Sequence, residues 1–162
     1  GILPRVDQPT GQEEFAEAAL PLLDTPMRDR ISLITNRAVR DRNFRKVILR
    51  AYDNKCAISG LRLINGGGRA EVEAAHIKPV EHHGPDIVGN GIALSGTAHW
   101  MFDRGLVGLS DDLSILISRQ ANDVEAVRSM INKTGKLILP RKMADHPRGA
   151  CITWHREHCF KA

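Results

Sequence analysis

Three polar residues, spaced 14 and then 9 positions apart, constrain the fold of this chain more than any other feature: His76, Asn90 and His99. Each lies in a segment with a different local pattern. The first histidine ends a strand pattern, the asparagine lies in a glycine-containing loop, and the second histidine lies in a helix pattern. A strand, a loop and a helix in this order predict a compact unit that gathers the three side chains at one place.

Local patterns define the elements around these residues. Residues 71–77 have the composition of a strand, which Pro79 ends. Residues 80–93 contain a proline and three glycines, and we expect them to form an irregular loop. Residues 94–103 fit a helix that Gly105 terminates.

Further elements surround this unit. Residues 56–60 have the pattern of a short strand with a turn, which would pair with the strand before Pro79 in a hairpin with one broad loop. A second small hairpin is expected over 107–117, a helix over 123–131 and an extended piece over 136–139. From position 146 onward there is little periodicity. Helices mixed with small hairpins predict an α+β fold.

The N-terminal part has a different character. The first twelve residues carry two prolines and read as an arm or linker, and residues 13–20 form a candidate short helix. Residues 27–52 are helical in pattern, although the apolar face is interrupted and residues 41–43 could divide it into two helices. We therefore expect residues 1–41 to form an N-terminal arm and helix of unknown role, and residues 42–162 to form the main domain.

Charge and cysteine content narrow the function classes. The net charge is +4, and Arg28 to Arg50 holds eight basic residues against two acidic ones. Such a block favours either a nucleic-acid phosphate contact or a solvated helix face. The chain has three cysteines, a small and odd number that argues against a disulfide framework. This cysteine content favours a reducing compartment. The sequence contains no apolar stretch long enough to span a bilayer, so no membrane partner is expected.

Beyond the three polar residues, several blocks are similar to successive blocks of the restriction-type HNH endonucleases, the McrA-like group. The similarity covers roughly Arg42 to Phe160, so residues 42–162 are predicted to be an HNH nuclease domain. It implies an α+β domain built on a ββα-metal finger, flanked by helices and a small second hairpin. The blocks are Phe44–Asp53, Cys56–Gly60, Glu73–His76, His99–Gly105 and Trp154–Glu157.

The resemblance implies a role for each polar residue. His76 is the expected general base, since an imidazole titrates near neutral pH and can deprotonate a water. Asn90 ties the loop across the motif. His99 is the expected metal ligand, and Asp103, four residues later, shares its helix face. The position directly before the base, which many family members fill with a metal-binding Asp or His, is Ala75 here; Glu73, two residues further back, is the expected replacement.

The chemistry implied is hydrolysis of a DNA phosphodiester with one divalent metal ion, Mg²⁺, Mn²⁺, Ni²⁺ or Zn²⁺, which neutralises developing negative charge. The expected partner is double-stranded DNA, contacted through its phosphates. The resemblance also implies a bacterial, cytoplasmic restriction or phage-defence role, with a separate target-recognition domain. The expected DNA-binding residues are Arg37, Arg40, Arg42, Arg45, Lys46 and Lys78.

Two other interpretations remain open at this point. Ala75 favours a non-catalytic DNA-binding or interaction module that retains the HNH finger but has lost cutting. A third interpretation is a zinc-stabilised interaction domain, because cysteine and histidine are zinc ligands and four of them lie close together near the C-terminus. These four residues are Cys151, His155, His158 and Cys159.

Overall fold

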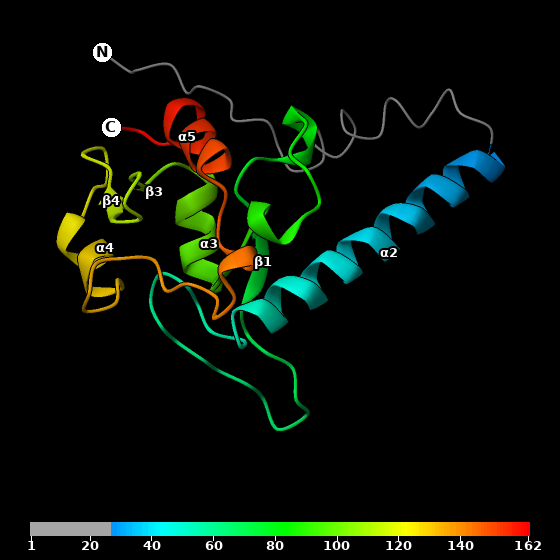
Figure 1. The fold of residues 1–162 in the computed structure, drawn as a ribbon, viewed down its shortest axis with the longest axis horizontal. Coiled ribbons are helices and arrows are strands. Elements are labelled where there is room, and N and C mark those ends of the chain that lie inside the picture. The colour runs from blue at the N-terminus through cyan, green and yellow to red at the C-terminus, as the bar shows by residue number, and fades with distance from the viewer. Residues whose placement is uncertain (1–26) are drawn as a thin grey trace, which may run out of the picture. The chain divides into compact units, whose positions relative to one another are not determined.

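The structure, a computed structural model, describes residues 27–162 (Figure 1). The expected helix over 13–20 therefore lies outside the described residues. The chain divides into two compact units, residues 1–41 and residues 42–162. Helix α2, Met27–Ala51, contains the described residues of the first unit, 27–41, and its remaining residues begin the second unit. The division of this stretch into two helices is not observed, because Asp, Arg and Asn at 41–43 are tolerated within a helix.

The centre of the second unit is a pair of antiparallel strands with a helix against it. Strand β1, Glu73–His76, pairs with β2, Gly91–Leu94, so that His76 lies opposite Gly91. Helix α3, Gly96–Asp103, follows β2 directly and packs against both strands. Figure 1 shows α3 beside β1. This arrangement, with the second strand pair described below, confirms the α+β class.

Two of the expected elements around this centre are wrong. The partner of β1 is β2, which lies within the stretch 80–93 that was expected to be an irregular loop and extends to Leu94, the expected first helical residue. Residues 56–60 form a turn and not a strand, although Ala57 donates one backbone hydrogen bond to Ala93 of β2 at 2.8 Å. Strand β2 carried no detectable signal because all four of its residues are buried, so no apolar–polar alternation exists.

The remaining elements cover this centre. Strands β3, Val107–Leu109, and β4, Ile115–Ile117, form the expected second hairpin, and α4, Val124–Ser129, lies within the expected helix. Short 3₁₀ turns occur at Val80–His82, Val88–Asn90 and Met143–Asp145. Helix α5, Gly149–His158, packs against β3 and occupies the tail for which no element was expected.

The C-terminal half of α2 anchors to the strand pair through an unusually close approach. Ile48 is fully buried, and Phe44 is 8% exposed. A Cβ atom at Gly91 would lie 2.3 Å from Cδ1 of Ile48 and 2.8 Å from Cζ of Phe44. Only glycine lets the helix side chains reach the backbone of β2 here, and this contact brings Phe44 to the end of β1. Among residues 27–162, no helix has the length and apolar character needed to cross a membrane.

Candidate active site

Three of the predicted site residues meet at the junction of β1 and α3. Glu73, at the start of β1, accepts a hydrogen bond through Oε2 from Nδ1 of His99 at 2.5 Å. Asp103, one turn further along α3, lies with Oδ2 3.1 Å from Nε2 of the same ring. The His99 side chain is 24% exposed, whereas both carboxylates are about half exposed. One imidazole thus lies between two carboxylates contributed by a strand and a helix.

This environment favours the charged imidazole. The hydrogen bond to Asp103 is the main cause that raises the pKa of His99 to about 9; partial burial opposes it, and the hydrogen bond to Glu73 adds to it. Both ring nitrogens then carry a proton, and each donates to a carboxylate. In the absence of a metal ion, a proton therefore holds the cluster together.

The side chains of Glu73, His99 and Asp103 do not converge on one point. Within residues 27–162, no three His, Cys, Asp or Glu side chains converge on a single point that could hold a metal ion. The reason at this cluster is that Glu73 faces Nδ1 of His99 and Asp103 faces Nε2, and the lone-pair directions of the two ring nitrogens diverge. The C-terminal cysteines and histidines form no such group either: His155 is buried and hydrogen-bonds the carbonyl of Phe102 through Nε2 at 2.9 Å.

His76 lies in a second set of contacts at the other end of β1. Its Nε2 atom is 2.8 Å from Oδ1 of Asp86, and its ring stacks on that of Phe44 with centroids 3.9 Å apart and planes 3° from parallel. No residue in the described part of the chain hydrogen-bonds its other nitrogen, Nδ1. Asp86 thus fixes the Nε2 edge of the ring, and Phe44 fixes one of its faces. The Nδ1 edge has no hydrogen-bond partner among the described residues.

Asn90 holds the loop that follows His76. Its side chain is fully buried; Oδ1 accepts from the backbone N–H of Lys78, and Nδ2 donates to the carbonyls of Lys78 and Pro85, all at 2.9 Å. These three bonds tie Lys78, two positions after His76, to Pro85, directly before Asp86. The asparagine therefore fixes the relative positions of an imidazole and a carboxylate that it does not touch.

Asp86 is the residue of this site that sequence reasoning missed. The segment between His76 and Asn90 contains two acidic residues, Glu81 and Asp86, and no local signal distinguishes them. Only the course of the loop decides which one reaches the imidazole.

The two sets of contacts lie close together without touching. Glu73 and His76 are three residues apart on β1, which separates their Cα atoms by about 10 Å. Alternation along the strand directs the two side chains to opposite faces of the strand pair, one toward α3 and one toward α2. No contact joins His76 to His99 within the described residues, and their convergence on one cation and water stays a prediction.

Helix α5 supports the end of α3 at Asp103. The ring of His155 stacks on Phe102 at 3.7 Å, and the Cys159 thiol lies 3.2 Å from the carbonyl of Asp103. Burial lowers the pKa of His155, which keeps the ring neutral while it donates to Phe102. The C-terminal block of the resemblance thus packs against the end of the helix that carries His99 and Asp103.

The expected DNA-binding residues differ in how they are used. Arg37 and Arg40, in the first unit, are exposed. In the second unit Arg42 and Lys46 are also exposed, whereas Nη2 of Arg45 donates to the carbonyls of Ala70 and Val72 at 3.3 and 3.2 Å. The sixth residue is Lys78, whose Nζ lies 5.8 Å from the ring centroid of Trp154.

Residues 56–110 match the family model described as HNH endonuclease. The resemblance to the HNH endonucleases is thereby confirmed. The matched residues, called the HNH segment below, include every residue of both sets of contacts except Phe44. Among curated proteins, none matches the chain.

A solved structure supports the fold beyond the HNH segment. It is described as a modification-dependent TagI restriction endonuclease, with a TM-score of 0.56 and 23% sequence identity over 71% of this chain. At this identity the likeness shows the fold alone. The present chain spans 36% of the length of that protein.

Proposed function

We propose that this chain is a divalent-metal-dependent DNA endonuclease that hydrolyses phosphodiester bonds. The observation that carries the proposal is the Glu73–His99–Asp103 cluster, which shares strand β1 with the oriented imidazole of His76 and lies within a segment that matches the HNH endonucleases. Phosphodiester hydrolysis requires a cation that neutralises the developing negative charge and a general base that takes a proton from the attacking water.

The donor atoms fit a divalent cation at one edge of His99. Two ligands bound at about 2.1 Å in cis positions are separated by roughly 3 Å, and Nε2 of His99 and Oδ2 of Asp103 are 3.1 Å apart. In this arrangement Glu73 would accept the Nδ1 proton and fix the tautomer that leaves Nε2 free to bind. Glu73 as a direct ligand of the same cation would require one of the side chains to turn. A bound cation would supply charge neutralisation for the phosphate and the leaving oxygen.

His76 is proposed as the general base. In the proposed tautomer, Nε2–H of His76 donates a hydrogen bond to Asp86, so the lone pair on Nδ1 is available to take a proton from a water. As the proton arrives on Nδ1, the ring becomes an imidazolium whose charge Asp86 stabilises. Phe44 prevents the ring from tilting out of this position, and Asn90 holds the loop that carries Asp86.

The proposed setting is restriction or phage defence in the bacterial cytoplasm. The structural neighbour is a restriction endonuclease described as modification-dependent, and this chain covers only part of that protein's length. We therefore propose that this chain is a cleavage domain and that a separate domain selects the target. The expected phosphate contacts from Arg37, Arg40, Arg42, Arg45, Lys46 and Lys78 carry no sequence information.

A plasmid-nicking assay tests the proposal. Supercoiled DNA is incubated with the chain and Mg²⁺, Mn²⁺, Ni²⁺ or Zn²⁺, and we expect open-circular and linear products that EDTA prevents. His76→Ala should lower the rate by about 10²–10⁴-fold, as for loss of a general base. His158→Ala, a histidine outside both sets of contacts, is the matched control. Equal rates for the His76 variant and the control would refute the role of His76.

A non-catalytic DNA-binding module is the second candidate function. Ala75 favours it, and so does the lack of a third ligand on one centre within the described residues. This function predicts DNA binding that depends on salt, with intact plasmid at every divalent ion tested.

A further inference from the structure

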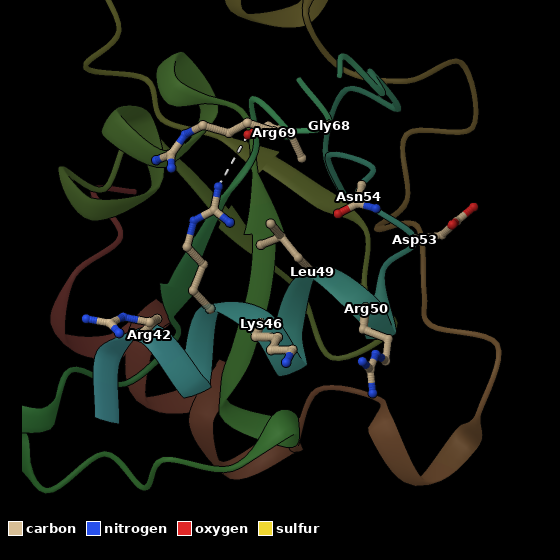
Figure 2. A pocket seen from close by; sticks show the side chains of 10 residues that line it. Arg42, Lys46, Leu49, Arg50, Asp53, Asn54, Gly68 and Arg69 are labelled. Atoms are coloured by element: carbon tan, nitrogen blue, oxygen red, sulfur yellow. Dashed lines mark hydrogen bonds between the residues drawn. The ribbon is translucent and has the colours of Figure 1, made fainter. Parts of the chain in front are cut away.

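A basic pocket lies between the C-terminal half of α2 and the loop that precedes β1 (Figure 2). Its volume is ≈ 540 Å³. Figure 2 shows Arg42, Lys46 and Arg50 along the helix, with Arg69 on the facing loop. We call this the basic pocket, and all of its lining residues belong to the second unit. They are Arg42, Arg45, Lys46, Leu49, Arg50, Asp53, Asn54, Gly68, Arg69 and Ala70.

Within residues 27–162, no ion pair neutralises the basic side chains of this pocket. Asp53 is its only acidic lining residue, and its carboxylate already lies 3.9 Å from Nη2 of Arg62. Arg42, Lys46 and Arg50 follow one another at intervals of four residues, so they repel each other along one helix face. Arg50 is also explained by the negative end of the helix dipole, but the other two are not. Such a cluster becomes favourable when an anion occupies the pocket.

Arg45 has a different role from its neighbours. Its guanidinium bonds the carbonyls of Ala70 and Val72 and so fastens the loop to the helix. On the same loop, Oδ1 of Asn65 accepts the N–H groups of Gly67 and Arg69 at 3.0 and 2.9 Å, which orders the turn before Arg69. Arg45 and Asn65 therefore fix the conformation of the loop that forms one wall of the basic pocket.

The basic pocket is tied to the candidate active site through β1. Ala70, in its wall, precedes Glu73 by three residues and His76 by six, so it lies at most about 20 Å from the proposed base. This is less than one turn of B-DNA, which is about 34 Å. One duplex can therefore contact both places.

We propose that the basic pocket binds the phosphate backbone of the duplex that is cut, within about six base pairs of the reacting phosphate. Arg42, Lys46, Arg50 and Arg69 make the contacts, and Arg45 is structural. This inference rests on the proposed function for the identity of the duplex, but binding at the pocket is independent of cutting. It adds Arg50 and Arg69 to the DNA-binding residues expected from the sequence, and it takes Arg45 out of that set.

Salt-dependent binding tests the proposal. A fluorescein-labelled 20-base-pair duplex is titrated with the full chain in EDTA at several KCl concentrations, and log K is plotted against log [KCl]. Replacing the four contact residues by Gln should lower the magnitude of the slope by about 2–4, since each phosphate contact contributes roughly 0.9. The replacements are Arg42→Gln, Lys46→Gln, Arg50→Gln and Arg69→Gln.

The control removes the same net charge from exposed positions outside the pocket and should change the slope by less than about 1. It carries Arg119→Gln, Lys133→Gln, Arg141→Gln and Lys142→Gln, all exposed. A charge-keeping variant with Arg42→Lys, Arg50→Lys and Arg69→Lys should retain the wild-type slope, which separates loss of charge from loss of fold. Equal slopes for the pocket variant and the control overturn the proposal, as does a lost slope in the charge-keeping variant.

Plasmid nicking with divalent ions is measured on the same proteins. If the wild type cuts DNA but the pocket variant keeps its salt slope, the pocket proposal fails and the nuclease stands. If the slope falls as expected but the wild type cuts nothing, the pocket stands and the nuclease fails. Inorganic phosphate at equal ionic strength should compete only weakly; full displacement by millimolar phosphate would indicate a small-anion site and overturn the duplex assignment.

Discussion

Because His99 is held in its charged form between Glu73 and Asp103, we expect the metal-free protein to lose stability as the pH rises above neutral. The pKa of His99 is raised from 6.5 to about 9 in the folded chain. A group whose pKa is raised by folding contributes its full stabilisation below its unfolded pKa, here about 6.5. That contribution is lost as the pH rises through the folded value. The affected window therefore runs from about pH 6.5 to a little above pH 9.

The magnitude follows from the size of the shift. One pKa unit corresponds to about 1.4 kcal/mol, so the shift corresponds to at most about 3–4 kcal/mol. The carboxylates of Glu73 and Asp103 are 55% and 53% exposed, and water screens such contacts. We therefore expect a loss of about 1–2 kcal/mol of the free energy of unfolding.

Urea unfolding in EDTA measures this loss. Intrinsic fluorescence of Trp100 and Trp154 follows the transition at pH 6.5, 7.5, 8.5 and 9.5. With a slope of about 2 kcal/mol/M, the midpoint should fall by about 0.5–1 M across the window. His99→Gln removes the titrating group, so its midpoint should change much less, and the difference between the two proteins isolates His99 from other groups that titrate in this range.

Two variants assign the effect to its causes. Asp103→Asn removes the main cause of the raised pKa and should abolish most of the pH dependence, whereas Glu73→Gln should abolish less of it. A wild-type midpoint that stays constant between pH 6.5 and 9.5 would refute the reasoning. So would a midpoint that falls equally in wild type and His99→Gln.

Three further predictions follow from the same geometry. Binding of Ni²⁺ or Zn²⁺ at His99 must displace a proton, so the apparent affinity measured by calorimetry should rise about tenfold per pH unit between pH 7 and 9; an affinity independent of pH would exclude binding at this imidazole. Asp86→Asn should lower kcat for DNA cutting about tenfold or more, as loss of an orienting partner does, with KM unchanged; a change in KM alone would assign Asp86 to DNA binding. Asn90→Ala should lower the free energy of unfolding by about 3 kcal/mol, because it removes the three hydrogen bonds of a fully buried side chain, each of which contributes about 1 kcal/mol; a loss below about 1 kcal/mol in urea unfolding would contradict this.

Local sequence patterns predicted the elements that have one apolar face or that end at a strong terminator such as glycine. The helix carrying His99 ends where Gly105 stops it, and the hairpin over 107–117 is present. In contrast, β2 is buried on both faces and shows no apolar–polar period, so its sequence predicts a loop. Helix α5 was missed because its buried face includes the polar residue His155, whose burial depends on the end of α3.

The residue types and the spacing of His76, Asn90 and His99 are enough to place them in a segment of HNH type. Which acids reach the histidines depends on the folded chain: Glu73 contacts His99 across 26 positions, and Asp86 rather than Glu81 contacts His76. The physical reason is that a carboxylate acts over a few ångströms in space. Strand pairing and the course of a loop set that distance, and neither leaves a local pattern in the chain.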